Sequence, residues 1–233
     1  MNSQTRRLTL QGPAGAIEVQ VDEPTLGADI ALQGVAVIAH PHPLFGGTMD
    51  NKVVQTLARA FVQCGWRAVR FNFRGVGASE GVYDEGRGEL QDLLSVITQA
   101  IHGAGGLGGL GAAPTSTPTL PLALAGFSFG SFVVSHAVAA LGADAAPQKL
   151  VLVGTAATRF DVAPIAPALH ERTLVLHGEI DDTVPLTDVL QWARPQILPV
   201  TVIPGTGHFF HGQLPLLRSL VVRHLNTPPI HFA

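Results

Sequence analysis

The 233-residue sequence is poor in cysteine and in charge. It holds a single cysteine, Cys64, which excludes an internal disulfide and a metal site built from several thiolates. Charged residues make up 13% of the chain, with 14 Lys and Arg against 17 Asp and Glu. A nucleic-acid-binding protein would need a concentrated basic face, so the composition predicts no nucleic-acid partner.

The N-terminal residues contain no apolar run of the length that a secretory signal peptide requires, so we expect a cytoplasmic protein. Residues 93–143 lack Asp, Glu, Lys and Arg and are hydrophobic enough to resemble a membrane span. Gly126, Ser128 and His136 interrupt this stretch. It is therefore interpreted as a buried strand, a turn and a buried helix, and no membrane partner is expected.

Runs of apolar residues outline alternating strands and helices. Residues 17–23 alternate apolar and polar side chains, as a half-exposed antiparallel strand does. Further apolar strands, typical of a sheet covered on both faces, follow at residues 35–39, 67–73, 120–126, 150–155, 173–177 and 200–203. Helices are expected at residues 51–64, 89–101, 128–141, 186–193 and 214–225. The pattern predicts an α/β fold with a mainly parallel sheet and helices on both faces.

No shift in composition marks a second domain, so residues 1–233 are expected to form one α/β domain. Residues 102–118 are rich in Gly, Ala and Pro without a period and are interpreted as a flexible surface loop. The stretch 156–172 between two of the late strands is too short for a large lid.

The sequence GFSFG at residues 126–130 lies between a predicted strand and a predicted helix. This G-x-S-x-G pattern places Ser128 on a sharp turn, whose close packing requires small residues two positions away on each side. The hydroxyl then lies at a helix N-terminus, where backbone N–H groups favour developing negative charge. The motif predicts a nucleophile; the alternative is a glycine-rich turn in which Ser128 only caps the helix.

A serine hydroxyl becomes a good nucleophile only when a base takes its proton. His208 follows the strand at 200–203 in a glycine-flanked loop, at the sheet edge where Ser128 also emerges. It is therefore the favoured base. His211, three residues further on, is the alternative base or a residue that lines the pocket.

An acid must orient the histidine, and the segment HGEIDDTVP at residues 177–185 offers three carboxylates after a strand. Asp181 is the favoured acid. Asp182 is alternatively a cap for the short helix that follows, and Glu179 is expected to be solvated. The chain order is then serine, acid, histidine, the order of α/β-hydrolases.

Other motifs accompany GFSFG in chain order: HPHPLFGG at residues 40–47, RGVGASEG at 74–81, HGEIDD at 177–182 and GTGH at 205–208. In this combination the chain, from about residue 35 to 225, resembles the α/β-hydrolase superfamily, and within it the small, lidless bacterial hydrolases related to dienelactone hydrolase. The resemblance implies that Ser128 is the nucleophile, Asp181 the acid and His208 the base. Dienelactone hydrolase itself has a cysteine where this chain has serine.

An oxyanion hole needs two backbone N–H donors. Phe129, directly after the serine, supplies one. The second is expected from the loop at 40–47, in which His42, Leu44 and Phe45 have an N–H to give, and the resemblance favours Leu44. His40 and His42 could alternatively bind a metal, but without a third clustered ligand no metal site is expected.

Arg74 could bind an anionic group of the substrate or, alternatively, hold a surface loop through hydrogen bonds. His42, Phe45 and His211 are the other expected substrate contacts. The GVG at residues 75–77 lacks a third glycine and a following lysine, so no nucleotide cofactor, and no cofactor of any kind, is expected.

These features predict a serine hydrolase, a monomer or homodimer, that cleaves small carboxylic esters through an acyl-enzyme intermediate. Short acyl chains are expected to be preferred. The alternatives are a thioesterase or an amide or peptide hydrolase with the same triad, or a non-catalytic binding protein on a hydrolase frame.

Overall fold

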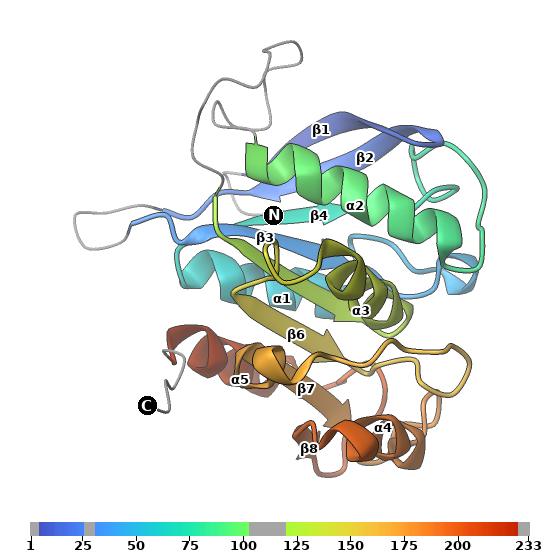
Figure 1. Ribbon diagram of the computed structural model, residues 1–233, viewed down its shortest axis with the longest axis vertical. Coiled ribbons are helices and arrows are strands. Elements are labelled where there is room, and N and C mark those ends of the chain that lie inside the picture. Colours follow the sequence, from blue (N-terminus) through green and yellow to red (C-terminus); the bar gives the residue numbers. More distant parts are fainter. Residues whose placement is uncertain (1–4, 26–30, 103–119, 228–233) are drawn as a thin grey trace.

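The structure of the chain is a computed structural model that describes residues 5–25, 31–102 and 120–227. Within these ranges an eight-stranded sheet runs through the centre of the molecule, in the order β1-β2-β4-β3-β5-β6-β7-β8 (Figure 1). The loop expected at 102–118 lies outside the described residues from 103 onward, and His102 is the last residue of a helix.

The strands, in chain order, are β1 (Thr5–Gly12), β2 (Gly15–Asp22), β3 (Gly34–Ala39), β4 (Trp66–Phe71), β5 (Leu122–Phe127), β6 (Lys149–Val153), β7 (Thr173–Gly178) and β8 (Val200–Ile203). Strand β2 pairs antiparallel with β1 and β4, and every pairing from β4 to β8 is parallel. The mainly parallel sheet is thereby confirmed. The sequence prediction missed β1, in which only Leu8 and Leu10 alternate with polar residues.

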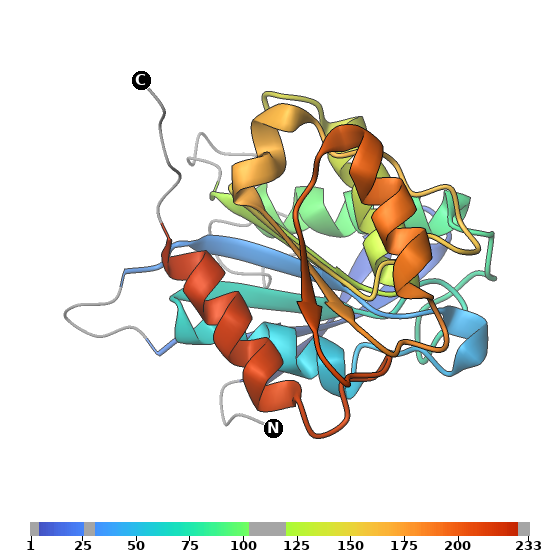
Figure 2. The ribbon, with the colours of Figure 1, turned by 90° about the horizontal axis from the view of Figure 1, so that it is seen from below.

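The longer helices are α1 (Lys52–Gln63), α2 (Arg87–His102), α3 (Phe129–Leu141), α4 (Leu186–Ala193) and α5 (Leu214–Asn226). Short 3₁₀ helices occur at Pro43–Phe45, Pro167–Arg172 and Arg194–Gln196. Figure 2 shows the sheet between two layers, with α1 and α5 on one face and α2, α3 and α4 on the other. The expected three-layer α/β arrangement is confirmed.

Burial explains why these segments take these forms. All six residues of β3 are buried, since helices cover both faces of the sheet there. Helix α1 turns Val53, Leu57 and Phe61 toward the sheet; its first turn is capped by Asn51, whose side chain accepts a hydrogen bond from the Val53 amide at 2.9 Å.

The parallel strands end at a common edge, and the loops that follow β3, β5, β7 and β8 meet there. Between β6 and β7, a single 3₁₀ helix is the regular structure in the described chain, and no inserted domain stands over the edge. Among the described residues no helix is both long and apolar enough to span a membrane.

Candidate active site

Ser128 lies between β5 and α3, in a backbone conformation with φ 56° and ψ −118° that side-chain-bearing residues rarely adopt. The neighbouring glycines make this turn possible. A Cβ at Gly126 would lie 2.5 Å from the backbone of Gly130, and one at Gly130 would lie 2.4 Å from the carbonyl oxygen of Ala39. The turn therefore has the strand–turn–helix geometry expected of a nucleophile elbow. Ser128 itself makes no side-chain cap for α3.

A line of hydrogen bonds leads from Ser128 into the protein. The Nε2 atom of His208 lies 3.0 Å from the Ser128 Oγ, and its Nδ1 atom lies 2.7 Å from Oδ2 of Asp181. The partners fix the tautomer: Nδ1–H donates to the carboxylate, which leaves Nε2 free to accept the serine proton. The three residues come from three loops at the carboxyl edge of the sheet, and all are buried.

The carboxylate of Asp181 is held by the turn that follows it. Its Oδ1 accepts hydrogen bonds from the amides of Thr183 at 3.0 Å and Val184 at 2.8 Å. Burial alone would raise the pKa of Asp181, but these bonds, the bond from His208 and the nearby imidazole charges outweigh it and hold the pKa below its ordinary value. Asp181 is therefore ionised at neutral pH.

The other candidates for the base and the acid lie outside this line of hydrogen bonds. His211 is exposed, contacts the ring of Phe209 and is not among the residues that line the cavity at Ser128. Asp182 does not cap α4, which begins without a side-chain cap. Glu179 accepts a hydrogen bond from the amide of Gly205 at 2.8 Å, on the outside of the same loop pair.

The loop after β3 corrects the expected second oxyanion donor. The amide of Leu44 donates to Nδ1 of His42 at 3.2 Å, and the amide of Phe45 donates to the His42 carbonyl at 3.1 Å. The amides of His42 and Phe129, in contrast, have no acceptor among the described residues. Leu44 therefore does not fit the role, and the donor that the loop leaves open is His42.

A cavity of about 50 Å³ adjoins Ser128. Its walls are mainly aromatic and aliphatic, and include the expected contacts His42 and Phe45. Residues that the sequence reasoning missed complete the lining: Ala156, Thr158, Arg159, Phe160, Thr183 and Val184. Most of them lie after β6, where no motif marks them. Burial lowers the pKa of His42, and the charge of Arg159 lowers it further.

Arg74 does not reach this cavity. Its guanidinium forms two hydrogen bonds with Asp92, at 2.9 and 2.8 Å, and the Arg74 amide donates to the same carboxylate at 3.1 Å. Asp92 belongs to α2 and is almost fully buried. The expected substrate contact is therefore wrong, and Arg74 fastens the loop after β4 to α2.

His40 is fully used inside the protein. Its Nδ1 lies 2.6 Å from the carbonyl of Pro41, and its Nε2 accepts from the amide of Phe73 at 3.0 Å. Burial lowers the pKa of His40 to about 4. With both nitrogens occupied it offers no lone pair to a metal, and no group of three potential metal ligands occurs in the described part of the chain.

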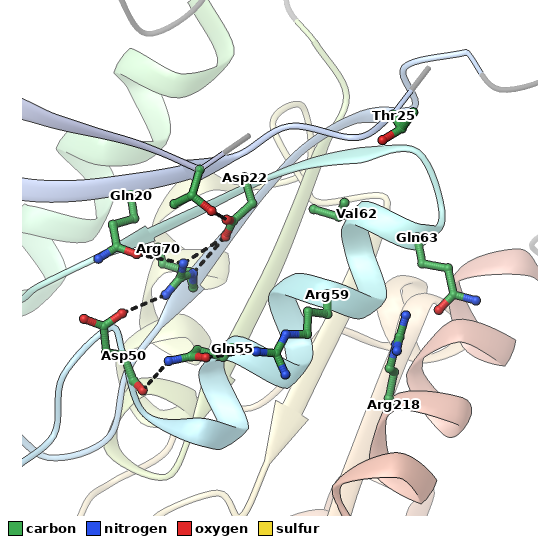
Figure 3. A pocket seen from close by; sticks show the side chains of 11 residues that line it. Gln20, Asp22, Thr25, Asp50, Gln55, Arg59, Val62, Gln63, Arg70 and Arg218 are labelled. Atoms are coloured by element: carbon green, nitrogen blue, oxygen red, sulfur yellow. Dashed lines mark hydrogen bonds and ion pairs between the residues drawn. The ribbon is translucent and has the colours of Figure 1, made fainter. Parts of the chain in front are cut away.

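A second and larger cavity, of about 620 Å³, lies between the polar face of β2 and helix α1 (Figure 3). At its floor the buried side chain of Arg70 is surrounded by oxygens. It donates to Asp22 at 3.0 Å, to Gln20 at 2.8 Å, to the Met49 carbonyl at 2.9 Å and to Asp50 at 3.2 Å. Neither Ser128 nor any residue of its cavity lines this space.

Known proteins share both sequence and fold with this chain. The solved structure of XC6422 from Xanthomonas campestris, an α/β serine hydrolase without a lid, is 36% identical, covers 98% of this chain and 99% of its own, and superposes with a TM-score of 0.78. An α/β serine hydrolase homologue from Coxiella burnetii is 35% identical, with a TM-score of 0.74 over 94% of this chain and 97% of its own.

The uncharacterized protein RP471 of Rickettsia prowazekii is 35% identical over 214 residues, which are 88% of this chain and 82% of RP471. A scan against models of protein families finds no match. The identities and the coverage of the solved structures are high enough to assign a family: the chain belongs to the α/β serine hydrolases.

Proposed function

We propose that this protein is a carboxylesterase in which Ser128 carries the acyl group. The observation that supports the proposal most directly is the continuous pair of hydrogen bonds, 3.0 Å from Ser128 to His208 and 2.7 Å from His208 to Asp181. A serine, a histidine and a carboxylate joined in this way activate the serine for acyl transfer, and the strained turn at Ser128 is typical of a functional site.

The chemistry runs in two halves. As the Ser128 oxygen attacks the ester carbonyl carbon, its proton moves to Nε2 of His208, and the carbonyl oxygen becomes negative. The amides of Phe129 and His42 stabilise this oxyanion. When the bond from carbon to the alcohol oxygen breaks, His208 gives the proton to the leaving alcohol. Water then attacks the acyl-enzyme with His208 again as base, and releases the acid and the free Ser128.

The size of the cavity argues for a small acyl group. About 50 Å³ is space for a few water-sized groups, because one water needs roughly 10–15 Å³ of such volume. Acetyl and butyryl esters are therefore expected to react faster than long-chain esters.

The test compares hydrolysis of 4-nitrophenyl acetate and butyrate by the natural protein and by Ser128→Ala. We expect kcat/KM to fall by about 10⁴-fold or more, since removal of a serine nucleophile disables the whole relay. Ser135→Ala, which removes a buried hydroxyl from the same helix away from the cavity, is the matched control and should retain activity.

Labelling with a fluorophosphonate, followed by peptide mapping, should place the probe on Ser128 alone. Retained turnover in Ser128→Ala, or a label elsewhere, would contradict the proposal. Rapid cleavage of a thioester or an amide, with slow cleavage of the matched ester, would replace the substrate class but keep the mechanism.

A further inference from the structure

The lining of the cavity at Ser128 includes one cationic side chain, Arg159, in the part of the chain that the structure describes. Its guanidinium carbon lies 5.7 Å from the centre of the Phe45 ring, within the range of a cation–π contact. Phe45 is 73% exposed, so this pair forms the outer rim of the cavity and not its floor. The contact keeps an otherwise long and exposed side chain near the entrance.

Within the described residues, the charge of Arg159 is not neutralised by a carboxylate. Arg70 and Arg74 each have carboxylate partners, whereas no Asp or Glu of the described residues lies within 4.0 Å of Arg159. The lining of the cavity also contains no carboxylate. The entrance therefore combines one positive charge with apolar walls, and such walls weaken the screening of that charge.

The charge of Arg159 also acts on His42, another residue of the cavity lining. Burial is the main reason that the pKa of His42 is lowered, and the charge of Arg159 adds to it. The imidazole of His42 also packs against the rings of Phe45 and Phe160, at centroid distances of 4.7 and 5.8 Å. A group that enters the cavity thus passes between aromatic rings and beside a guanidinium.

We propose that Arg159 makes this enzyme selective for esters that carry an anionic group, such as a carboxylate, on the part that remains outside the small cavity. The inference rests on the esterase function proposed above. The acyl group fits the cavity at Ser128, while the alcohol part lies along Phe45 with its anion at the guanidinium. A flat, aromatic alcohol with a carboxylate satisfies both the ring and the charge.

The test uses a pair of acetates that differ in one charge, 4-acetoxybenzoate and its methyl ester. The measured quantity is the ratio of kcat/KM for the anionic ester to that for the neutral ester. We expect Arg159→Gln to lower this ratio about tenfold, the size of one charge-assisted hydrogen bond at a partly exposed site. Arg159→Lys keeps the charge and should retain part of the preference. Arg223→Gln, an exposed arginine on α5, is the matched control.

Salt supplies a second readout. The preference of the natural protein for the anionic ester should weaken as the ionic strength rises, because ions screen the guanidinium, and Arg159→Gln should show no such dependence. A merely structural role of Arg159 would lower both kcat/KM values together and leave their ratio and its salt dependence unchanged. That outcome would overturn the inference.

A second pair, ethyl hydrogen succinate and ethyl butanoate, places the anion on the acyl part instead. If only this pair depends on Arg159, the assignment of the anion to the outer part is wrong. The proposed esterase function is judged separately by Ser128→Ala. Turnover that depends on Ser128, with a charge preference that ignores Arg159, would refute this inference and leave the esterase standing.

Discussion

The two cavities of this molecule differ in whether the polar groups around them are already hydrogen-bonded within the protein. The cavity beside α1 measures about 620 Å³ and the one at Ser128 about 50 Å³. In the large one, Arg70 has oxygens around its whole guanidinium, so the charge is used up within the protein. In the small one, the amides of His42 and Phe129 have no acceptor among the described residues.

The comparison teaches that polar groups left open to a ligand identify a site better than volume does. A donor that no protein acceptor satisfies costs stability unless water or a ligand pairs with it, so such donors at a cavity are available to a ligand. Ser128 adds a strained backbone at the same place. The network around Arg70, in contrast, joins β2 and β4 to the start of α1 and is complete without a ligand.

The strongest test of this difference makes the same substitution, Asp to Asn, beside each of the two cavities. Asp181→Asn leaves the shape of the acid but gives His208 a partner that no longer fixes its tautomer. We expect kcat/KM to fall by about 10⁴-fold, as the loss of the orienting carboxylate does in other serine hydrolases. Asp22→Asn in the network of Arg70 should change kcat/KM less than about threefold.

Stability should respond in Asp22→Asn instead. A buried ion pair that loses one partner costs about 3 kcal/mol or more, and the midpoint of urea unfolding reports that change. An Asp22→Asn enzyme as inactive as Asp181→Asn, under conditions where both are folded, would remove the distinction between the two cavities.

Much of this architecture could be predicted from the sequence, because the signals are local. Buried strands such as β3 are unbroken apolar runs, and α1 has an apolar stripe and a capping residue. Strand β4 ends earlier than expected, after Phe71, because the amide of Phe73 turns to His40. Phe73 has an aromatic side chain of the kind that favours strands, and the sequence carries no sign of this tertiary hydrogen bond.

The three residues of the hydrogen-bonded line could be predicted from their motifs, but the roles that depend on which partner a side chain or an amide finds in the fold could not. Ser128, Asp181 and His208 each follow a strand, and the geometry brings them together. Arg74 stands in a motif and Arg159 does not, yet Arg74 is paired with Asp92, whereas Arg159 has no carboxylate partner among the described residues. For the second oxyanion donor, the tight turn decides: the amide of Leu44 is hydrogen-bonded to the His42 ring, and the amide of His42 is not bonded within the described residues.

A second prediction concerns His40, another polar group used up within the protein. Its pKa is about 4 in the folded chain, against about 6.5 when unfolded, because burial disfavours the charged ring. Between these values the unfolded state binds a proton that the folded state does not. The stability is therefore fully present above pH 6.5 and declines as the pH falls toward 4, by about 3 kcal/mol from this residue.

Urea unfolding at pH 7, 5.5 and 4 measures this contribution. His40→Gln cannot titrate, so the difference in unfolding free energy between it and the natural protein should shrink as the pH falls. If the two proteins lose stability in parallel, His40 does not keep its proton affinity low in the folded state.

The smallest effect is expected at His177. One of its ring nitrogens is hydrogen-bonded within the protein, and the other has no partner among the described residues. It is fully buried at the end of β7, with Nε2 at 2.9 Å from the carbonyl of Val184 and 3.6 Å from Oδ2 of Asp181. The bond to Val184 closes the same turn whose amides hold Asp181. Its Nδ1 has no hydrogen-bond partner in the described chain, and an unpaired buried nitrogen lowers the stability of the folded protein.

We expect His177→Leu to lower kcat about tenfold with little change in KM, because a slightly displaced Asp181 misaligns His208 rather than the substrate. The unfolding free energy should change by less than about 1 kcal/mol, because the loss of the bond to Val184 and the removal of the unpaired Nδ1 act in opposite directions. His177→Gln can donate to Val184 again and should recover most of kcat. If kcat and stability instead fall together and Gln rescues neither, His177 only fills space in the core. The relay from Ser128 would then end at Asp181 and its two amides.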